Sequence, residues 1–101
     1  ETARRIRSSL RNYDIAGRYG GEEFLVILPG ANREDALRTL ERVRLAVGGT
    51  PMETLDGGAV AVTASIGFAC DDGESNPDVL VRRADAALYR AKNDGRNRVN
   101  E

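Results

Sequence analysis

The chain has 101 residues, of which 41% are hydrophobic and 31% are charged, as is typical of a single soluble globular domain and not of a disordered segment. One cysteine, Cys70, excludes an intrachain disulfide and suits a reducing compartment, so we expect a cytoplasmic location. The net charge of −1 and the lack of any apolar run near the roughly 20 residues of a membrane span favour neither a nucleic-acid partner nor membrane contact.

The first expected elements are a helix, a tight turn and two strands. Apolar residues recur at helical spacing from Ala3 to Leu10, and the polar residues 11–14 end this helix. A strand is expected over Ile15–Tyr19, a turn at Gly20–Gly21, and a second strand over Phe24–Leu28. The unbroken apolar run of the second strand is typical of burial on both faces, which predicts a central strand.

A second helix is expected from Asn32 to the glycine pair 48–49. Asn32 can cap its first turn, and the two glycines can end it. Its predicted apolar stripe comprises Ala36, Leu40, Val43 and Val47.

A short strand over Met52–Leu55, a turn at 56–58 and a long strand over Ala59–Ala69 are expected next. The polar residues 70–75 form a predicted loop. The last helix begins after Asn76 with Pro77 in its first turn and ends near Gly95, leaving residues 96–100 as a tail. Its predicted buried stripe comprises Leu80, Ala84, Ala87, Leu88 and Ala91. This order indicates an α+β sandwich with helices on one side of a sheet.

The turn between the first two strands carries two glycines and two carboxylates, Gly20, Gly21, Glu22 and Glu23. One interpretation is a plain hairpin turn with solvated glutamates beside it. Adjacent glutamates repel one another and are poor strand formers, so a bound cation would offset their cost. The glycines leave room for a phosphate-bearing ligand. With no histidine in the chain, a metal would have oxygen ligands, which favours Mg²⁺ or Mn²⁺.

Three blocks of the sequence resemble the GGDEF domains, the diguanylate cyclases. The segment RYGGEEF (18–24) is similar to their signature, VTASIGFA (62–69) to their strand before the last helix, and RRADAALYRAKNDGRNRV (82–99) to their last helix and tail. The resemblance implies a ferredoxin-like fold of the nucleotidyl-cyclase palm type. It also implies condensation of two GTP molecules into cyclic di-GMP, with loss of pyrophosphate, by a homodimer whose two domains each present one GTP.

The resemblance assigns roles to residues of the turn and of the last helix. Gly20 and Gly21 would pack against the nucleotide. Glu22 and Glu23 would be catalytic metal ligands, with Glu22 also the site of 3′-hydroxyl deprotonation. The pair Lys92 and Arg96, expected on one helix face at i,i+4 spacing, would bind the β- and γ-phosphates. A basic helix end that complements the dipole is an equally open interpretation of that pair.

The segment RNYD, from Arg11 to Asp14, matches the position of the family's inhibitory RxxD site. It would bind cyclic di-GMP, with Arg42 completing the site. An arginine fork can bind guanine O6 and N7, and a carboxylate can accept from guanine N–H groups. A surface ion pair of little energetic consequence is the alternative.

The family's first, central strand, with its metal-binding aspartate and a guanine-reading residue, has no counterpart in this sequence. We therefore expect a single GGDEF domain over residues 1–101, N-terminally truncated relative to the family, with a gap between 24–28 and 60–69 that a second copy could fill. An N-terminal sensory module is expected in the full protein. The alternatives to a cyclase are a non-catalytic cyclic di-GMP binding module and a plain α+β interaction domain.

Overall fold

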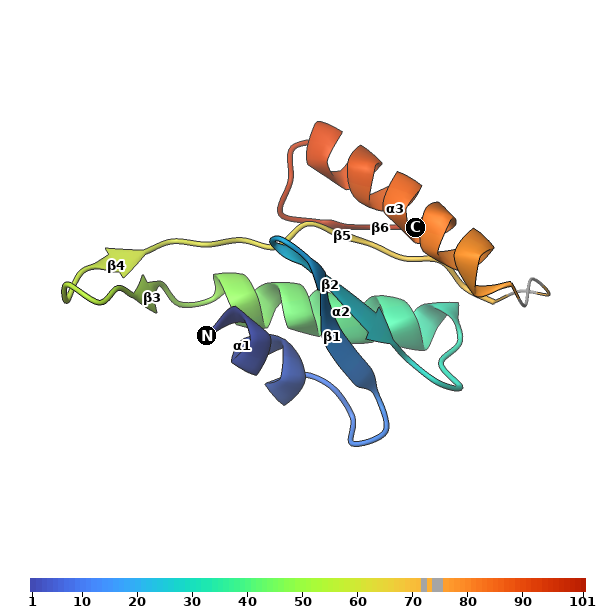
Figure 1. Cartoon of the computed structure of the whole chain (residues 1–101), viewed down its shortest axis with the longest axis horizontal. Helices are drawn as coiled ribbons and strands as arrows, with labels where there is room; N and C mark the ends of the chain where they lie inside the picture. The colour runs from blue at the N-terminus through green and yellow to red at the C-terminus, as the bar shows by residue number, and fades with distance from the viewer. Residues whose placement is uncertain (72, 74–75) are drawn as a thin grey trace.

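A computed structural model of the chain describes residues 1–71, 73 and 76–101. The elements follow one another as α1 (Thr2–Ser8), β1 (Ile15–Gly20), β2 (Glu23–Ile27), α2 (Arg33–Gly48), β3 (Met52–Glu53), β4 (Ala59–Val60), β5 (Ile66–Gly67), α3 (Pro77–Asn93) and β6 (Val99–Asn100). Figure 1 shows their arrangement, with the β3–β4 hairpin projecting at one end. Of the predicted loop 70–75, residues 72, 74 and 75 lie outside the described residues. No helix in the described ranges is long and apolar enough to cross a bilayer.

Helix α2 forms as its sequence predicts and supplies the centre of the core. The Asn32 side chain accepts a hydrogen bond from the Asp35 backbone N–H at 2.8 Å, which caps the first turn. The four predicted stripe residues are all buried. Val43 and Val47 pack with Ile6 of α1 and with apolar side chains of the β1–β2 hairpin. Toward the other end of the helix, a second cluster contains Phe68.

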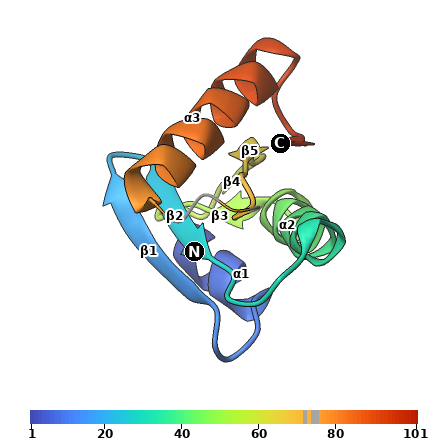
Figure 2. The ribbon, with the colours of Figure 1, turned by 90° about the vertical axis from the view of Figure 1, so that its right-hand side faces the viewer.

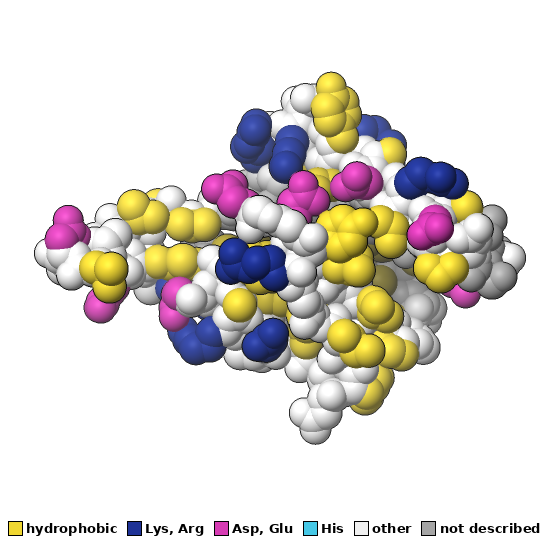
Figure 3. All heavy atoms as spheres, in the orientation of Figure 1, with side chains coloured by type: hydrophobic (Ala, Val, Ile, Leu, Met, Phe, Trp, Pro, Cys, Tyr) yellow, Lys and Arg dark blue, Asp and Glu magenta, His cyan; other side chains and the backbone are white. Residues whose placement is uncertain are grey.

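The β1–β2 hairpin is antiparallel, with Ile15 opposite Ile27 and Gly20 opposite Glu23. The turn therefore falls at residues 21–22, one position later than predicted. The prediction of a central strand over 24–28 is wrong, because β2 is only half-buried and its one partner among the described residues is β1. On the face seen in Figure 3, hydrophobic side chains gather along this hairpin. Ile15 and Ile27 are among its exposed apolar residues.

The long strand predicted over Ala59–Ala69 is also wrong. The sequence alternates as a strand should, but only its two ends are paired: β4 with β3 in an antiparallel hairpin, and β5 with β6 in parallel. Residues 61–65 have no strand assignment, and β2 and β5 are not paired with each other among the described residues. A strand is defined by hydrogen bonds to a neighbour, so an extended segment without one is not a strand.

The β5–β6 pair lies between α2 and α3 (Figures 1 and 2). Ile66 and Phe68 pack toward α2, whereas Gly67 between them faces α3, where an added Cβ would lie 2.1 Å from the Leu88 backbone nitrogen. Helices therefore cover both faces of this pair, which corrects the one-sided arrangement that we expected. The predicted tail is corrected as well, because its last residues form β6 beside Ile66–Gly67.

Helix α3 begins as predicted, with the Asn76 side chain accepting from the Asp78 N–H at 2.9 Å and Pro77 in the first turn. Within its predicted stripe, Ala87 and Ala91 are fully buried and the other members are half-buried. Small side chains on this face suit the close approach of β5.

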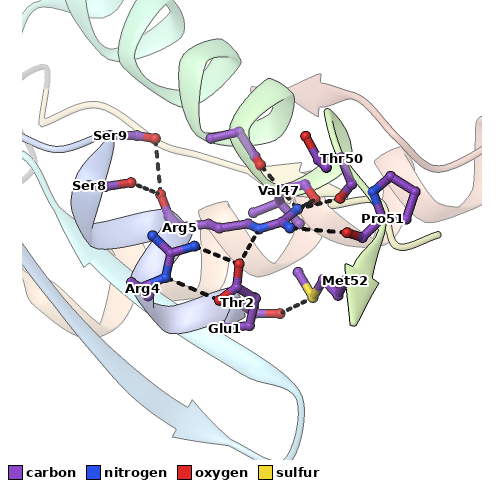
Figure 4. Close-up of polar contacts among 11 residues, drawn as sticks. Glu1, Thr2, Arg4, Arg5, Ser8, Ser9, Val47, Thr50, Pro51 and Met52 are labelled. Atoms are coloured by element: carbon purple, nitrogen blue, oxygen red, sulfur yellow. Dashed lines mark hydrogen bonds and ion pairs between the residues drawn. The ribbon is translucent and has the colours of Figure 1, made fainter. Parts of the chain in front are cut away.

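Helix α1 is anchored to the end of α2 by Arg5 (Figure 4). Its Nη1 donates to the Val47 carbonyl at 2.9 Å and to the Thr50 carbonyl at 2.6 Å, while its Nε donates to the Glu1 carboxylate at 2.8 Å. The last carbonyls of a helix have no partner within the helix, so this guanidinium satisfies groups that α2 cannot satisfy itself. Hydrogen bonds from Arg4 and Arg5 lower the pKa of Glu1 to about 2.

Candidate functional site

The two glutamates lie at the tip of the β1–β2 hairpin and are exposed. Glu22 lies in the turn and Glu23 is the first residue of β2. Gly21 has φ +44°, a backbone conformation that glycine adopts without the steric cost of a Cβ. No heavy atom lies within 4 Å of a Cβ built on Gly20 or Gly21, so the backbone of the turn is open to a ligand.

Arg18 stabilises this turn, a contribution that we did not predict. Its Nη1 donates to the Gly21 carbonyl at 3.3 Å, and its guanidinium lies 5.3 Å from the centroid of the Phe24 ring. Arg18 and Phe24 are opposite one another in the hairpin register. The signal was available in the sequence, because two residues that flank a short hairpin turn must face each other.

The carboxylates of the turn fit a hard divalent cation in chemistry, though not as a complete cage. Glutamate oxygens suit Mg²⁺ or Mn²⁺, and Mg²⁺ is commonly held by one or two carboxylates together with substrate phosphates. Among residues 1–71, 73 and 76–101, no group of three or more acidic or thiol side chains is close enough to hold a metal. Glu22 and Glu23 could therefore supply only part of such a site, and the remaining ligands would have to come from elsewhere.

The predicted phosphate pair is not on one helix face. Lys92 lies in the last turn of α3, but the helix ends at Asn93, and Arg96 follows with φ +61° after Gly95 at φ +121°. The Arg96 Nη1 folds back to donate to the Lys92 carbonyl at 3.4 Å. The i,i+4 prediction was wrong, because that spacing gives a common face only within a helix. Here the chain leaves the helix before residue 96, and residues 95 and 96 have left-handed backbone conformations. Both side chains are nevertheless exposed.

The structure brings Arg11 and Asp14 together, as the RxxD spacing predicts. Asp14 accepts from the Arg11 Nη2 at 2.7 Å and from the Arg11 backbone N–H at 2.8 Å. The carboxylate is fully buried, and these contacts hold the pKa of Asp14 below its usual value. Arg11 also donates from Nη2 to the Pro29 carbonyl at 3.3 Å, which ties the loop to the segment after β2. The pair is more than a surface ion pair, because its acidic partner is buried.

Arg42 comes close to this pair from α2. Its Nε donates to the Ser9 carbonyl at 3.0 Å, at the end of α1, and its charge also lowers the pKa of Asp14. The structure thus gathers the three predicted members of the inhibitory site, Arg11, Asp14 and Arg42. Arg11 and Asp14 line an open hollow of about 400 Å³ together with Arg7 and Asn12, two residues that were not predicted from the sequence.

The turn, the segment after α3 and the RxxD loop are not joined by a hydrogen bond or ion pair among the described residues. Neither Lys92 nor Arg96 makes a hydrogen bond or ion pair with Glu22 or Glu23 in the described structure.

Comparisons with known proteins agree over nearly the whole chain. A family model for the GGDEF domain of diguanylate cyclases matches residues 1–98. The response regulator PleD of Caulobacter vibrioides is 46% identical over 101 residues, which cover 98% of this chain and 22% of PleD.

Solved structures give the same result. Diguanylate cyclase SiaD of Pseudomonas aeruginosa, in complex with its activator SiaC, aligns with a TM-score of 0.88 and 45% identity over 98% of this chain and 38% of its own. The GGDEF domain of DgcB from Caulobacter crescentus, in complex with c-di-GMP, aligns with a TM-score of 0.88 and 37% identity over 98% of this chain and 59% of its own. The chain spans less than two thirds of the length of each protein. These neighbours confirm the α+β class and the palm-type fold, and the chain belongs to the GGDEF-domain family of diguanylate cyclases.

Proposed function

We propose that this domain condenses two GTP molecules into cyclic di-GMP, releasing two pyrophosphates. The observation that carries the proposal is the hairpin turn, which presents Glu22 and Glu23 on an open glycine backbone in a chain of the GGDEF family. Two copies act together, each presenting one GTP. Each 3′-oxygen forms a bond to the α-phosphorus of the other nucleotide, the bond from that phosphorus to pyrophosphate breaks, and the 3′-hydroxyl loses its proton.

Glu22 and Glu23 would hold Mg²⁺ or Mn²⁺ in this reaction. The ion, when bound, neutralises phosphate charge and lowers the pKa of the attacking hydroxyl. Glu22 receives the proton from the 3′-hydroxyl, and Gly20 and Gly21 let the nucleotide approach the backbone. Lys92, in the last turn of α3, and Arg96, just beyond its end, bind the terminal phosphates as exposed cations.

Cyclic di-GMP would inhibit the domain by binding at Arg11, Asp14 and Arg42. Because Asp14 is buried and already accepts hydrogen bonds from Arg11, guanine N–H groups reach it only if Arg11 turns away. Arg11 is then free to bind guanine or phosphate. Site and ligand are complementary in charge, because two arginines oppose one carboxylate. The exposed, conformationally permissive turn favours the enzyme over a module that only binds cyclic di-GMP.

A pair of substitutions tests the two sites separately. Glu22→Gln keeps the size of the side chain but removes its charge, so we expect loss of synthesis from GTP and Mg²⁺, with cyclic di-GMP binding unchanged. Arg11→Ala should do the reverse, losing binding while synthesis continues. Chromatography of the nucleotides measures synthesis, and calorimetry measures binding. Synthesis that survives Glu22→Gln, or binding that survives Arg11→Ala, would contradict the corresponding assignment.

A further inference from the structure

The hollow beside the RxxD loop is bordered by more positive charge than the loop itself supplies. Arg7, in the last turn of α1, lines it together with Arg11, Asn12 and Asp14. Arg7 and Arg11 lie four residues apart, and the Leu10 N–H donates to the Arg7 carbonyl at 3.2 Å, which continues the turn beyond the end of the helix. Both side chains are thereby brought to the same hollow.

Arg7 and Arg11, which line the hollow, and Arg42, which does not, differ in what they already bind. Arg11 is committed to Asp14 and to the Pro29 carbonyl. The Arg42 Nε donates to the Ser9 carbonyl, and the Arg42 charge attracts the Asp14 carboxylate at longer range. Arg7 is exposed and makes no side-chain hydrogen bond or ion pair with any residue that the structure describes. An uncommitted guanidinium at the edge of a hollow is available to an anion.

We propose that Arg7 is a further ligand-binding residue of the product site and contacts a phosphodiester of cyclic di-GMP. The inference rests on the proposed product binding at Arg11, Asp14 and Arg42. Cyclic di-GMP carries two phosphodiester charges, whereas Arg11 and Arg42 with the one carboxylate of Asp14 leave a single net positive charge in the proposed site. A guanidinium offers paired N–H donors that match two phosphate oxygens. Arg7 thus supplies a phosphate contact, while Arg11 and Asp14 read guanine.

A purely structural role for Arg7 makes a different prediction. A basic residue in the last turn of a helix also complements the helix dipole, and in that case its loss would lower thermal stability without affecting ligand affinity. Arg82 is a matched control, because it is an exposed arginine of α3, makes no side-chain hydrogen bond or ion pair with the residues that the structure describes, and does not line the hollow.

The experiment is calorimetric titration of the full chain with cyclic di-GMP, comparing the unsubstituted protein with Arg7→Gln, Arg7→Lys, Arg82→Gln and Arg11→Ala. We expect Arg7→Gln to weaken binding about ten- to 150-fold, the range for one hydrogen bond between charged groups. Arg7→Lys should recover part of this loss, because it keeps the charge but not the fork. Arg82→Gln should leave the affinity unchanged. Raising the salt concentration should weaken cyclic di-GMP binding by the unsubstituted protein more than binding by Arg7→Gln, because salt screens the contact that the variant lacks.

The outcomes separate this inference from the proposal beneath it. If the unsubstituted chain does not bind cyclic di-GMP, or if Arg11→Ala binds it equally well, the product site itself is wrong and the role of Arg7 falls with it. If Arg11→Ala abolishes binding but Arg7→Gln binds cyclic di-GMP with the same affinity as Arg82→Gln, the product site stands and the role of Arg7 is overturned. Competition by inorganic phosphate or GTP as effective as that by unlabelled cyclic di-GMP would show a general anion site and would also overturn it.

Discussion

Asp14 is the residue at which burial and charge act most strongly together. Its carboxylate is fully buried and accepts from both the side chain and the backbone of Arg11, and the pKa of Asp14 is lowered chiefly by the Arg11 side-chain hydrogen bonds. A carboxyl whose pKa is lower in the folded state stabilises the fold above its unfolded pKa, which is about 4. That stabilisation is lost as the pH falls through the folded pKa.

The prediction is a pH-dependent difference between the unsubstituted protein and Asp14→Asn. Urea unfolding should show the unsubstituted protein to be the more stable at neutral pH, and the difference in free energy of unfolding should shrink below about pH 4 as Asp14 takes up a proton. Asp85→Asn, which changes an exposed residue of α3, serves as the control. A difference that stayed constant from neutral to acidic pH would contradict the lowered pKa.

The sequence predicted single residues well where the argument was local, and failed where it depended on an unseen chain reversal. Arg11 and Asp14, three positions apart at a helix end, were singled out as a product site with an ion pair as the alternative, and the structure pairs their side chains. Arg96 was expected on the helix face of Lys92, but Gly95 and Arg96 both have positive φ and lie beyond the helix. Residue spacing predicts a common face only while the helix continues.

Helices were predictable at the scale of whole elements because their signals lie within their own segments. Both long helices begin after the expected asparagine caps. Asn32→Ala should lower the free energy of unfolding by about 1 kcal/mol, because the Asp35 N–H loses its acceptor. Asn32→Asp keeps an acceptor oxygen and should stay close to the unsubstituted protein. Equal losses for alanine and aspartate in urea unfolding would show that the cap is not the source of the effect.

Strands were predicted less well because each depends on a neighbour elsewhere in the chain. The alternation of residues 59–69 indicates an extended conformation, but only residues 59–60 and 66–67 have partners among the described residues. In the same way, Val99 and Asn100 of the expected tail form β6 because Ile66–Gly67 lies beside them. Apolar composition likewise made β2 resemble a central strand, although pairing leaves it at an edge.

The contact between β5 and α3 gives the sharpest test of element packing. A Cβ on Gly67 would lie 2.1 Å from the Leu88 backbone nitrogen and 2.4 Å from the Ala84 carbonyl oxygen, so α3 would have to move. Gly67→Ala should therefore destabilise the fold by about 1–3 kcal/mol or more. Gly17→Ala is the matched control, because no heavy atom lies within 4 Å of its added Cβ. A small effect of Gly67→Ala in urea unfolding would mean that α3 packs less closely than the structure has it.

At the scale of the whole molecule, α2 joins the surfaces that the proposed function uses. Its inner face packs with α1 and the hairpin through one apolar cluster and with β5–β6 through another, and its Arg42 reaches the RxxD loop. The positions of these surfaces relative to one another could not be read from the sequence, because they depend on how distant elements share one helix. The candidate residues of each surface were predicted from local motifs, and their roles stay predictions.

A single chain carries one Gly20–Glu23 turn, whereas the proposed reaction forms two phosphodiester bonds between two GTP molecules, so a productive assembly needs two intact turns. When the unsubstituted protein is mixed with Glu22→Gln chains at constant total concentration, cyclic di-GMP output should fall with the square of the unsubstituted fraction, because mixed dimers have only one working turn. Mixing with Gly17→Ala chains, which keep the turn, should not lower it. Output that fell only in proportion to the unsubstituted fraction would mean that one turn suffices, and that the second copy contributes no part of the reaction.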